Sequence, residues 1–381
     1  MLLPTFGAAI AARDVQSMLF PRASLIDGYS LAVRIFLLKS YYSTFIPGLL
    51  EPVEEALRSA LPDSRIVLSL DGLIAYESNE RIEVIQKLPF VTNSFAIIKR
   101  FAGQAAQNIP TIATGILKDR VLSFHMPVAV KPRNTFRVIT SVANQLVPLD
   151  NGIMRMLESW ITDKTGLQPN RSKPDFEFWL AQRSEGYGFF SLRVSHHKAY
   201  DKALQKGELR PELANILCRL SDPTQNELFL DPFCGSGAIP IQRAKFFAQG
   251  LVIASDKDER NIKSLKERVK NLSLQKRVVV RCDDALHLSR YEDRSIHKIV
   301  TDPPWGHFVG TNMPIDEFYR AMLSEFARLL RPEGRIVILT AETTAMDVVI
   351  ERCKHLTVSR KLNILVSGKK ASVYVLARSQ H

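Results

Sequence analysis

Short apolar runs alternate with amphipathic stretches through the second half of the chain. Apolar, β-branched runs of strand length occur at 228–231, 251–255, 277–281, 297–301 and 335–340. Stretches with helical spacing of apolar residues occur at 238–249, 259–271, 315–330 and 343–354. Two last runs, 361–366 and 372–377, are separated by a short turn and predict an antiparallel hairpin. The pattern predicts an α/β domain with a mostly parallel sheet that ends in an antiparallel strand.

The first half of the chain has a less regular pattern, which is typical of smaller α+β modules. Strand-like runs occur at 31–38, 65–69, 72–76, 94–100, 135–142, 175–180 and 188–194. A turn at 46–50 leads into an amphipathic helix that ends at Ala60, and the stretch 151–165 places Met154, Leu157 and Ile161 on one helical face. We expect three domains, with boundaries at 1–102, 103–194 and 195–381.

The composition adds a basic charge and excludes several classes of protein. The 381 residues carry a formal net charge of +12, and the basic residues are spread along the chain, which favours an anionic partner such as nucleic acid. The 4 cysteines form no Cys-x-x-Cys pair and accompany no paired histidines, so neither a structural zinc nor a disulfide framework is expected. No apolar run reaches the length of about 18 to 20 residues that crosses a bilayer, and the first residues lack the pattern of a secretory signal. We expect a cytoplasmic protein without a metal or a membrane partner, and we favour a monomer.

Acidic residues follow three successive predicted strands. Asp231 ends the first strand and precedes a glycine turn, Asp256 follows the second strand, and Asp283 and Asp284 follow the third. Each acid alone is also a common helix N-cap. Because the carboxyl ends of parallel strands share one edge of a sheet, however, the acids together predict one crevice for a nucleoside-like ligand. The glycine turn lets such a ligand lie against the backbone, and the second-strand carboxylate accepts hydrogen bonds from ribose hydroxyls.

A dinucleotide-binding site shares the glycine turn and the second-strand acid, so NAD is the main alternative ligand. The turn here reads Asp-Pro-Phe-Cys-Gly-Ser-Gly instead of Gly-x-Gly-x-x-Gly. The acid before the turn suits a cationic sulfonium nucleoside better than a pyrophosphate. The sequence therefore favours S-adenosylmethionine over NAD.

The run Asp302-Pro303-Pro304-Trp305, directly after the fourth predicted strand, is the most specific chemical signal in the chain. Its prolines restrict the backbone, so that the carboxylate of Asp302 and the carbonyl of Pro303 can both act as acceptors toward one point. Two acceptors that hold the hydrogens of an exocyclic base amine favour a pyramidal nitrogen aimed at a methyl group. Trp305 offers a flat face on which an extruded base can stack. In isolation an Asp-Pro-Pro run is also an ordinary turn.

With these residues the chain resembles class I methyltransferases of the amino-group type, over roughly residues 205–377. The resemblance implies a Rossmann-like domain with a seven-stranded, mostly parallel sheet, in which 302–305 corresponds to the Asp/Asn-Pro-Pro-aromatic catalytic motif. It also implies S-adenosylmethionine as the cofactor, with contacts from Arg210 in the segment before the first strand, from Asp231, Phe233, Gly235, Ser236 and Gly237 in the first motif, from Asp256 and Lys257, and from Asp283, Asp284 and Ala285. Asp284 corresponds to the acid that contacts adenine, and Asp283 is an equally placed rival for that role.

More specifically, the sequence resembles THUMP-domain RNA methyltransferases that make N2-methylguanosine in tRNA. In that family a ferredoxin-like module precedes the THUMP domain, and the segments 46–49, 135–138, 165–167 and 173–178 follow the order of its marks. The resemblance implies that 1–102 holds an N-terminal extension and a ferredoxin-like domain, that 103–194 is a THUMP domain that binds tRNA, and that 195–381 is the catalytic domain. Trp305 departs from the commoner tyrosine of the family, and the first 28 or so residues have no counterpart.

Three other functions stay open on the sequence. The same catalytic run serves methylation of guanine-N2 in ribosomal RNA or of adenine-N6 in DNA, and a non-catalytic RNA-binding protein with a decayed methyltransferase fold is a further alternative. The presence of intact motif residues argues against decay, namely Asp231, Gly235, Gly237, Asp256 and Asp302. Basic residues that could contact RNA phosphates are Lys99, Arg100, Lys131, Arg133, Arg137, Arg171, Lys173 and the run His196-His197-Lys198.

Overall fold

The structure is a computed structural model that describes residues 39–120, 122, 126, 128, 130–131, 133–195, 208–247, 250–306, 313–366 and 368–379. The strand predicted at 31–38 and the basic run at 196–198 lie outside these residues. No helix in the described ranges is long and apolar enough to cross a membrane.

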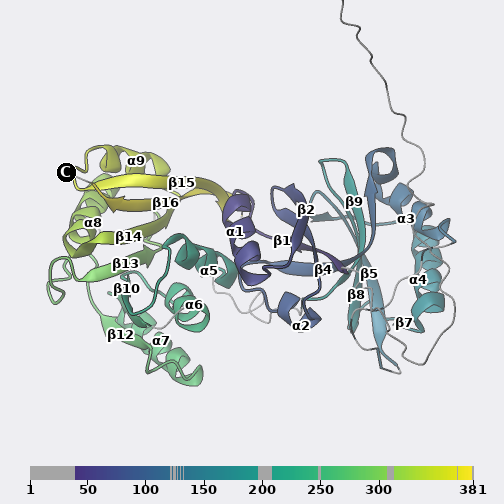
Figure 1. Ribbon diagram of the computed structural model, residues 1–381, viewed down its shortest axis with the longest axis horizontal. Coiled ribbons are helices and arrows are strands. Elements are labelled where there is room, and N and C mark those ends of the chain that lie inside the picture. The colour runs from purple at the N-terminus through teal and green to yellow at the C-terminus, as the bar shows by residue number, and fades with distance from the viewer. Residues whose placement is uncertain are drawn as a thin grey trace, which may run out of the picture. The chain divides into compact units, whose positions relative to one another are not determined.

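Residues 39–193 form one sheet with helices packed on it (Figure 1). Its strands are β1 (Lys39–Thr44), β2 (Arg65–Leu70), β3 (Leu73–Ser78), β4 (Asn93–Ala102), β5 (Thr135–Val142), β6 (Gln145–Leu146), β7 (Gln168–Pro169), β8 (Phe176–Gln182) and β9 (Tyr187–Arg193). Its helices are α1 (Leu50–Ala60), α2 (Ile82–Ile85), a 3₁₀ turn (Gly103–Ala106), α3 (Ile109–Leu117) and α4 (Asn151–Thr165). The strand order is β2-β3-β1-β4-β9-β8-β5-β6, with β7 beside β5. Because β4 pairs with β9, strands from both sides of residue 103 belong to the same sheet. The domain boundary expected at residue 103 stays a prediction.

Residues 208–379 form a second sheet with helices on both faces. Its strands are β10 (Glu227–Asp231), β11 (Gly250–Asp256), β12 (Val278–Cys282), β13 (Ile296–Thr301), β14 (Leu330–Thr340), β15 (Leu356–Val366) and β16 (Lys369–Arg378). Its helices are α5 (Pro211–Leu220), α6 (Ala238–Phe246), α7 (Glu259–Asn271), α8 (Ile315–Leu329) and α9 (Thr343–Glu351). The order is β12-β11-β10-β13-β14-β16-β15, and β16 runs antiparallel to both of its neighbours. The predicted seven-stranded, mostly parallel sheet is confirmed.

The central strands carry apolar residues on both faces because both faces are buried. Phe229 and Val252 face a core that includes α5, α6 and α7, whereas the next residues, Leu230 and Ile253, face a core built with α8 and α9. Figure 1 shows α5 and α6 on one side of β10, β13 and β14, and α8 and α9 on the other. Packing on both faces fixes the positions of the strand ends, where the polar residues lie.

A buried ion cluster joins β10 to β13 at the end of the sheet opposite the predicted crevice. Glu227, only 4% exposed, accepts from Arg243 at 2.9 Å and lies 3.4 Å from the Lys298 Nζ atom. The Thr224 hydroxyl donates a third contact at 2.8 Å. One carboxylate thus serves two buried cations, which are costly to leave unpaired.

Replacing Glu227 by Gln should destabilise the fold strongly. The neutral amide leaves Arg243 and Lys298 as buried cations without a counter-charge, so the free energy of unfolding should fall by about 3 to 5 kcal/mol. Urea denaturation followed by circular dichroism measures the change. The matched control is Glu333→Gln, which removes the carboxylate of an exposed ion pair with Arg331 and should leave the midpoint almost unchanged. Equal midpoints for Glu227→Gln and the wild type would show that the cluster does not carry this energy.

Candidate active site

The carboxyl ends of β10 and β13 meet at the point where the strand order of the second sheet reverses. From β10 the chain continues to β11 and β12 on one side, while β13 and β14 lie on the other side. Open α/β sheets form their ligand crevice at such a point. Asp231 is the last residue of β10 and Asp302 follows β13, so the structure places both predicted acids at this crevice.

Asp231 is a buried carboxylate that ties the two strand ends together. Its side chain accepts a hydrogen bond from the Thr301 hydroxyl at 2.7 Å and one from the Phe233 backbone N–H at 3.3 Å, and the residue is 1% exposed. Burial raises the pKa of Asp231 to about 8, although the hydrogen bonds lower it, and the charges of Asp256 and Asp302 add to the rise. Burial makes the ionised form of Asp231 unfavourable, and a cation bound in the crevice would stabilise it.

The glycine turn after β10 requires glycine at two positions. Gly235 has φ +46° and Gly237 has φ +90°, both in the left-handed region. A Cβ atom on Gly237 would lie 2.2 Å from the Leu265 Cδ1 atom, whereas one on Gly235 would meet no atom within 4 Å. The Gly235 backbone N–H donates to the Asp256 carboxylate at 2.9 Å, which joins the turn to the end of β11. Leu265 therefore fills the space beside Gly237, whereas the space beside Gly235 is free for a ligand.

A cavity of about 280 Å³ lies against this turn. Its lining residues are Glu208, Leu209, Asp231, Phe233, Cys234, Gly235, Ser236, Ala238, Ile239, Asn261 and Asp302. Three of them are acids, and no lysine or arginine is among these described residues. Such a lining fits the cationic sulfonium and ammonium groups of S-adenosylmethionine and disfavours a pyrophosphate.

The sequence-predicted residues fall into two groups relative to this cavity. Five line it, namely Asp231, Phe233, Gly235, Ser236 and Asp302. The lining does not include Arg210, Gly237, Asp256, Lys257, Asp283, Asp284, Ala285, Pro303, Pro304 or Trp305. The Arg210 guanidinium lies 3.5 Å from Glu212, Lys257 is exposed, and Ala285 is 4% exposed.

Sequence reasoning missed Glu208 and Asn261 in the lining. The Glu208 carboxylate accepts from the Ser236 hydroxyl and from the Arg268 guanidinium, each at 2.9 Å, so it reinforces the glycine turn from the segment before α5. Asn261 comes from the first turn of α7. Neither position belongs to a motif, and the only available signal was that Glu208 lies two residues before Arg210, which the resemblance places among the cofactor contacts.

The two acids after β12 have different surroundings. Asp283 accepts from the Tyr291 hydroxyl at 3.0 Å and lies 3.2 Å from the Arg290 Nε atom, and its side chain is only 6% exposed. The Asp284 side chain is 54% exposed and accepts only the short-range Leu286 backbone N–H, at 3.0 Å, besides a 3.6 Å approach from His287. Asp283 is therefore committed to the protein, while Asp284 is accessible to a ligand.

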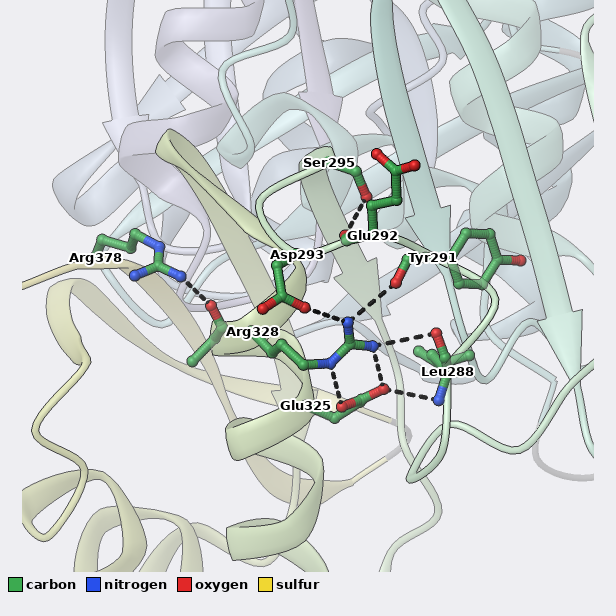
Figure 2. Close-up of polar contacts among 9 residues, drawn as sticks. Leu288, Tyr291, Glu292, Asp293, Ser295, Glu325, Arg328 and Arg378 are labelled. Atoms are coloured by element: carbon green, nitrogen blue, oxygen red, sulfur yellow. Dashed lines mark hydrogen bonds and ion pairs between the residues drawn. The ribbon is translucent and has the colours of Figure 1, made fainter.

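Arg328 of α8 holds the segment that carries these acids (Figure 2). Its guanidinium donates to the backbone carbonyls of Leu288 and Tyr291, at 3.2 and 3.0 Å, and to the carboxylates of Asp293 and Glu325. Glu325 in turn accepts the Leu288 backbone N–H at 2.7 Å. Hydrogen bonds to both carboxylates raise the pKa of Arg328 further, which keeps it charged. The loop between β12 and β13 is thus fastened to helix α8.

The catalytic run has an unexpected internal contact. The Trp305 indole N–H donates to the Asp302 carboxylate at 2.9 Å, so the ring is turned toward its own motif. Burial raises the pKa of Asp302 to about 7, and the Trp305 hydrogen bond opposes that rise. Trp305 is partly buried and packs against the core that includes α5 and α6. The indole therefore holds one oxygen of Asp302, which the predicted role in base stacking did not include.

Three of the seven individually named basic residues are engaged within the protein. Lys99 pairs with Asp119, Arg137 with Glu177, and Arg171 with Glu158. The other described ones are exposed and have no ion pair with a described residue, namely Arg100, Lys131, Arg133 and Lys173. The second group is the better source of phosphate contacts.

Comparison with known proteins gives relatives that are named as guanine-N2 methyltransferases of RNA. Residues 198–369 match the family model described as RMKL-like, methyltransferase domain. The chain is 23% identical to a tRNA (guanine(6)-N2)-methyltransferase of Methanocaldococcus jannaschii, over 88% of this chain and 99% of that protein. It is 30% identical to the human tRNA (guanine(6)-N(2))-methyltransferase THUMP3, over 45% of this chain but only 36% of the human protein. A Thermus thermophilus tRNA (guanine(6)-N2)-methyltransferase is 33% identical over 38% of this chain and 42% of its own length.

Solved structures share the fold over most of the chain. The crystal structure of TrmN from Thermus thermophilus superposes with a TM-score of 0.74 and 21% identity, covering 90% of this chain and 100% of that one. SMU.472, described as a putative methyltransferase complexed with SAH, has a TM-score of 0.67 and 14% identity, with coverage of 90% and 99%.

The sheet order and the crevice at its reversal point define a class I methyltransferase fold. The crevice lies in the part of the chain, residues 198–369, that matches the RMKL-like methyltransferase domain model.

Replacing Asp231 by Asn tests the burial of its carboxylate. Because the pKa of Asp231 is raised on folding, the stability from this group is full at acidic pH and is lost as the pH rises through about 8. Without added ligand, Asp231→Asn should therefore unfold at a higher temperature than the wild type at pH 9, and the gap should shrink toward pH 6. Differential scanning calorimetry measures both. The exposed residue Asp63, between α1 and β2, provides the control variant Asp63→Asn. A gap that stays constant from pH 6 to pH 9 would contradict the assignment.

Proposed function

We propose that this protein transfers a methyl group from S-adenosylmethionine to the exocyclic N2 atom of a guanosine in tRNA. The observation that carries the proposal is the joint position of Asp302 and Asp231 on one cavity with the glycine turn, at the reversal point of a class I methyltransferase sheet. The names of the M. jannaschii, human and T. thermophilus relatives support guanine-N2 in tRNA, and they favour the guanosine at position 6.

The residues around the crevice fit the proposed cofactor. Bound S-adenosylmethionine supplies an electrophilic methyl group on a cationic sulfur. Asp231 and Glu208 provide negative charge on its methionine side, and Phe233, Gly235, Ser236 and Gly237 shape the turn beside it. Asp256 and Lys257 are proposed for the ribose edge and Asp284, with Ala285, for the adenine edge, because Asp283 is already bonded to Tyr291. Arg210 is proposed to help the segment before β10 cover the cofactor.

The chemistry assigned to Asp302 is to accept hydrogens from the base amine. The amine of guanine is a weak nucleophile because its lone pair is shared with the ring. An ionised Asp302, with the Pro303 carbonyl as the second acceptor, would hold both hydrogens and direct the lone pair at the methyl group. Once the nitrogen is methylated it carries a surplus proton, which a carboxylate with a pKa near 7 can accept and release to water.

The N-terminal sheet is proposed as the tRNA-binding part, in keeping with the THUMP resemblance. Its exposed cations Arg100, Lys131, Arg133 and Lys173 are proposed to contact phosphates, since none of them has an ion pair with a described residue. A tRNA substrate agrees with the cytoplasmic location expected from the sequence, which stays a prediction.

A direct assay with three nucleic acids tests the proposal. Purified protein and labelled S-adenosylmethionine are incubated with tRNA, ribosomal RNA and DNA, and the modified nucleoside and its position are identified by mass spectrometry. We expect N2-methylguanosine in tRNA. Labelled N6-methyladenine in DNA alone, or label only in ribosomal RNA, would reject the tRNA proposal.

In the same assay Asp302→Ala should abolish transfer, because the amine loses its charged acceptor. We expect a loss of at least about 100-fold in kcat, by analogy with removal of one preorganised polar group in other active sites. Binding of S-adenosylhomocysteine, measured by calorimetry, should stay close to that of the wild type. Retained turnover would show that the acceptor is misassigned.

Trp305→Phe should shift the pH dependence of transfer. Phenylalanine keeps an aromatic face but has no N–H to donate, so the pKa of Asp302 should rise further above its ordinary value. Loss of one hydrogen bond to a charged group corresponds to a shift of about one pH unit. The acidic limb of the kcat/KM profile should therefore move to higher pH, with activity near the wild-type value at pH 9. A profile unchanged in position, with only KM altered, would mean that Trp305 acts by stacking alone.

A further inference from the structure

A second carboxylate lies against the catalytic run. Glu342 follows the end of β14, the strand next to β13, and Gly306 directly follows Trp305. A Cβ atom built on Gly306 would lie 2.4 Å from the Glu342 Oε1 atom and 3.1 Å from its Cδ atom. Gly306 also has φ +39°, a conformation that favours glycine. The missing side chain at position 306 therefore leaves the room that the Glu342 carboxylate occupies.

The charges of Glu342 and Asp302 act on the same buried hydroxyl. Burial raises the pKa of Tyr319 to about 12, and the negative charges of Glu342 and Asp302 both add to this rise, against a hydrogen bond with Thr340. The Tyr319 hydroxyl is 2.8 Å from the Thr340 Oγ1 atom, which also accepts the Glu342 backbone N–H at 3.0 Å. Asp302 and Glu342 thus follow neighbouring strands, and both act on the Tyr319 hydroxyl.

The Glu342 carboxylate has no structural partner in the part of the chain that the structure describes. Glu342 is the N-cap residue of α9, yet its side chain makes no capping hydrogen bond. It forms no hydrogen bond or ion pair with any described side chain, although it is partly buried. A partly buried carboxylate without a partner among the described residues is available to a ligand that has hydrogen-bond donors.

Guanine has the donors that this position needs. Its Watson–Crick edge carries the N1–H group directly beside the N2 amine, whereas adenine has an unprotonated N1 acceptor beside its N6 amine. An extruded base is recognised through this edge. If Asp302 holds the amine, a neighbouring carboxylate attracts the N1–H of guanine and repels the N1 lone pair of adenine.

We propose that Glu342 accepts the N1–H of the target guanine and so makes the site select guanine over bases that lack this hydrogen. This inference rests on the proposed function, and it adds the residue that chooses the base. One hydrogen bond to a charged acceptor corresponds to a discrimination of about 10- to 100-fold.

The test uses tRNA in which the target guanine is replaced by 2,6-diaminopurine, with the opposing base changed so that the stem stays paired. This base keeps the N2 amine but has an unprotonated N1. The wild type should prefer guanine by at least about 10-fold in kcat/KM. Glu342→Gln should bring that preference close to 1, because its amide oxygen still accepts from guanine and its N–H₂ group donates to the N1 of diaminopurine. The ratio of the two preferences cancels any difference in stem stability.

Two further variants separate recognition from general damage. Glu351→Gln removes an exposed carboxylate at the other end of α9 and should keep the wild-type preference. Gly306→Ala places a methyl group where the Glu342 Oε1 atom lies, so it should lower the guanine preference in the wild type but not in Glu342→Gln. Binding of S-adenosylhomocysteine should be the same in all variants, as a check of the fold.

The outcomes distinguish this inference from the proposed function. If the wild type transfers no methyl group to guanine in tRNA, the proposed function fails, and the Glu342 assignment fails with it. If the wild type methylates guanine and Glu342→Gln keeps the full preference over diaminopurine, only the Glu342 assignment is overturned. A lower rate on both substrates with an unchanged ratio also overturns it, because a purely structural role lowers both alike.

Discussion

The hydrogen bond between Asp231 and Thr301 is the contact on which the active site depends. It joins the carboxyl ends of β10 and β13 at 2.7 Å, and it is the point where the strand order of the sheet reverses. The carboxylate is almost fully buried, and hydrogen bonds from one hydroxyl and one backbone N–H do not restore what it loses in hydration. A fold that needed only to connect two strands would gain more from an apolar pair. Keeping an acid there is reasonable for a protein that binds a cation beside it, so the stability of the empty protein is lowered at the place where the ligand adds it back.

Two polar networks outside the cavity lining hold this arrangement in place. Glu227, with its two buried cations, fixes the opposite ends of β10 and β13, while Arg328 fastens the loop after β12 to α8. Arg328 bonds to backbone carbonyls, whereas the Glu227 cluster joins side chains of β10, α6 and β13. Neither network contributes to the lining of the cavity. The two networks fix the strands and the loop that carry the acids of the crevice. The acids therefore keep their positions without hydrogen bonds to one another. A charged, hydrated ligand can then be met by groups that do not have to reorganise, which is the main requirement of electrostatic catalysis.

The sequence predicts the second sheet well because its strands are buried on both faces and its helices are amphipathic. The predicted helix at 259–271 coincides with α7. In the first sheet, the predicted strand at 135–142 coincides with β5. Helix α3 was missed, because its sequence is rich in β-branched residues and has no polar face; Asn108 caps it through the Thr111 N–H, and its buried side chains come from packing on β8 and β9. In the active site, the motif residues could be placed on strand ends, but their mutual contacts could not. The bond between Trp305 and Asp302, and the difference between Asp283 and Asp284, depend on how distant segments pack.

Glu342 shows most clearly what a motif leaves out. The run after β13 provides acceptors for an amine, and guanine and adenine both present one, so the run by itself does not determine the base. The base must be distinguished by the atom next to the amine, which is a donor in guanine and an acceptor in adenine. In a parallel sheet the group placed to meet that atom comes from the end of the next strand, here β14, which is some forty residues away in the chain and carries no recognisable pattern. Gly306 links the two segments, because its missing side chain is the space that the β14 carboxylate fills. Chemistry and base choice are thus assigned to neighbouring strand ends, and a change after β14 can alter the base without disturbing the acceptor that drives the transfer.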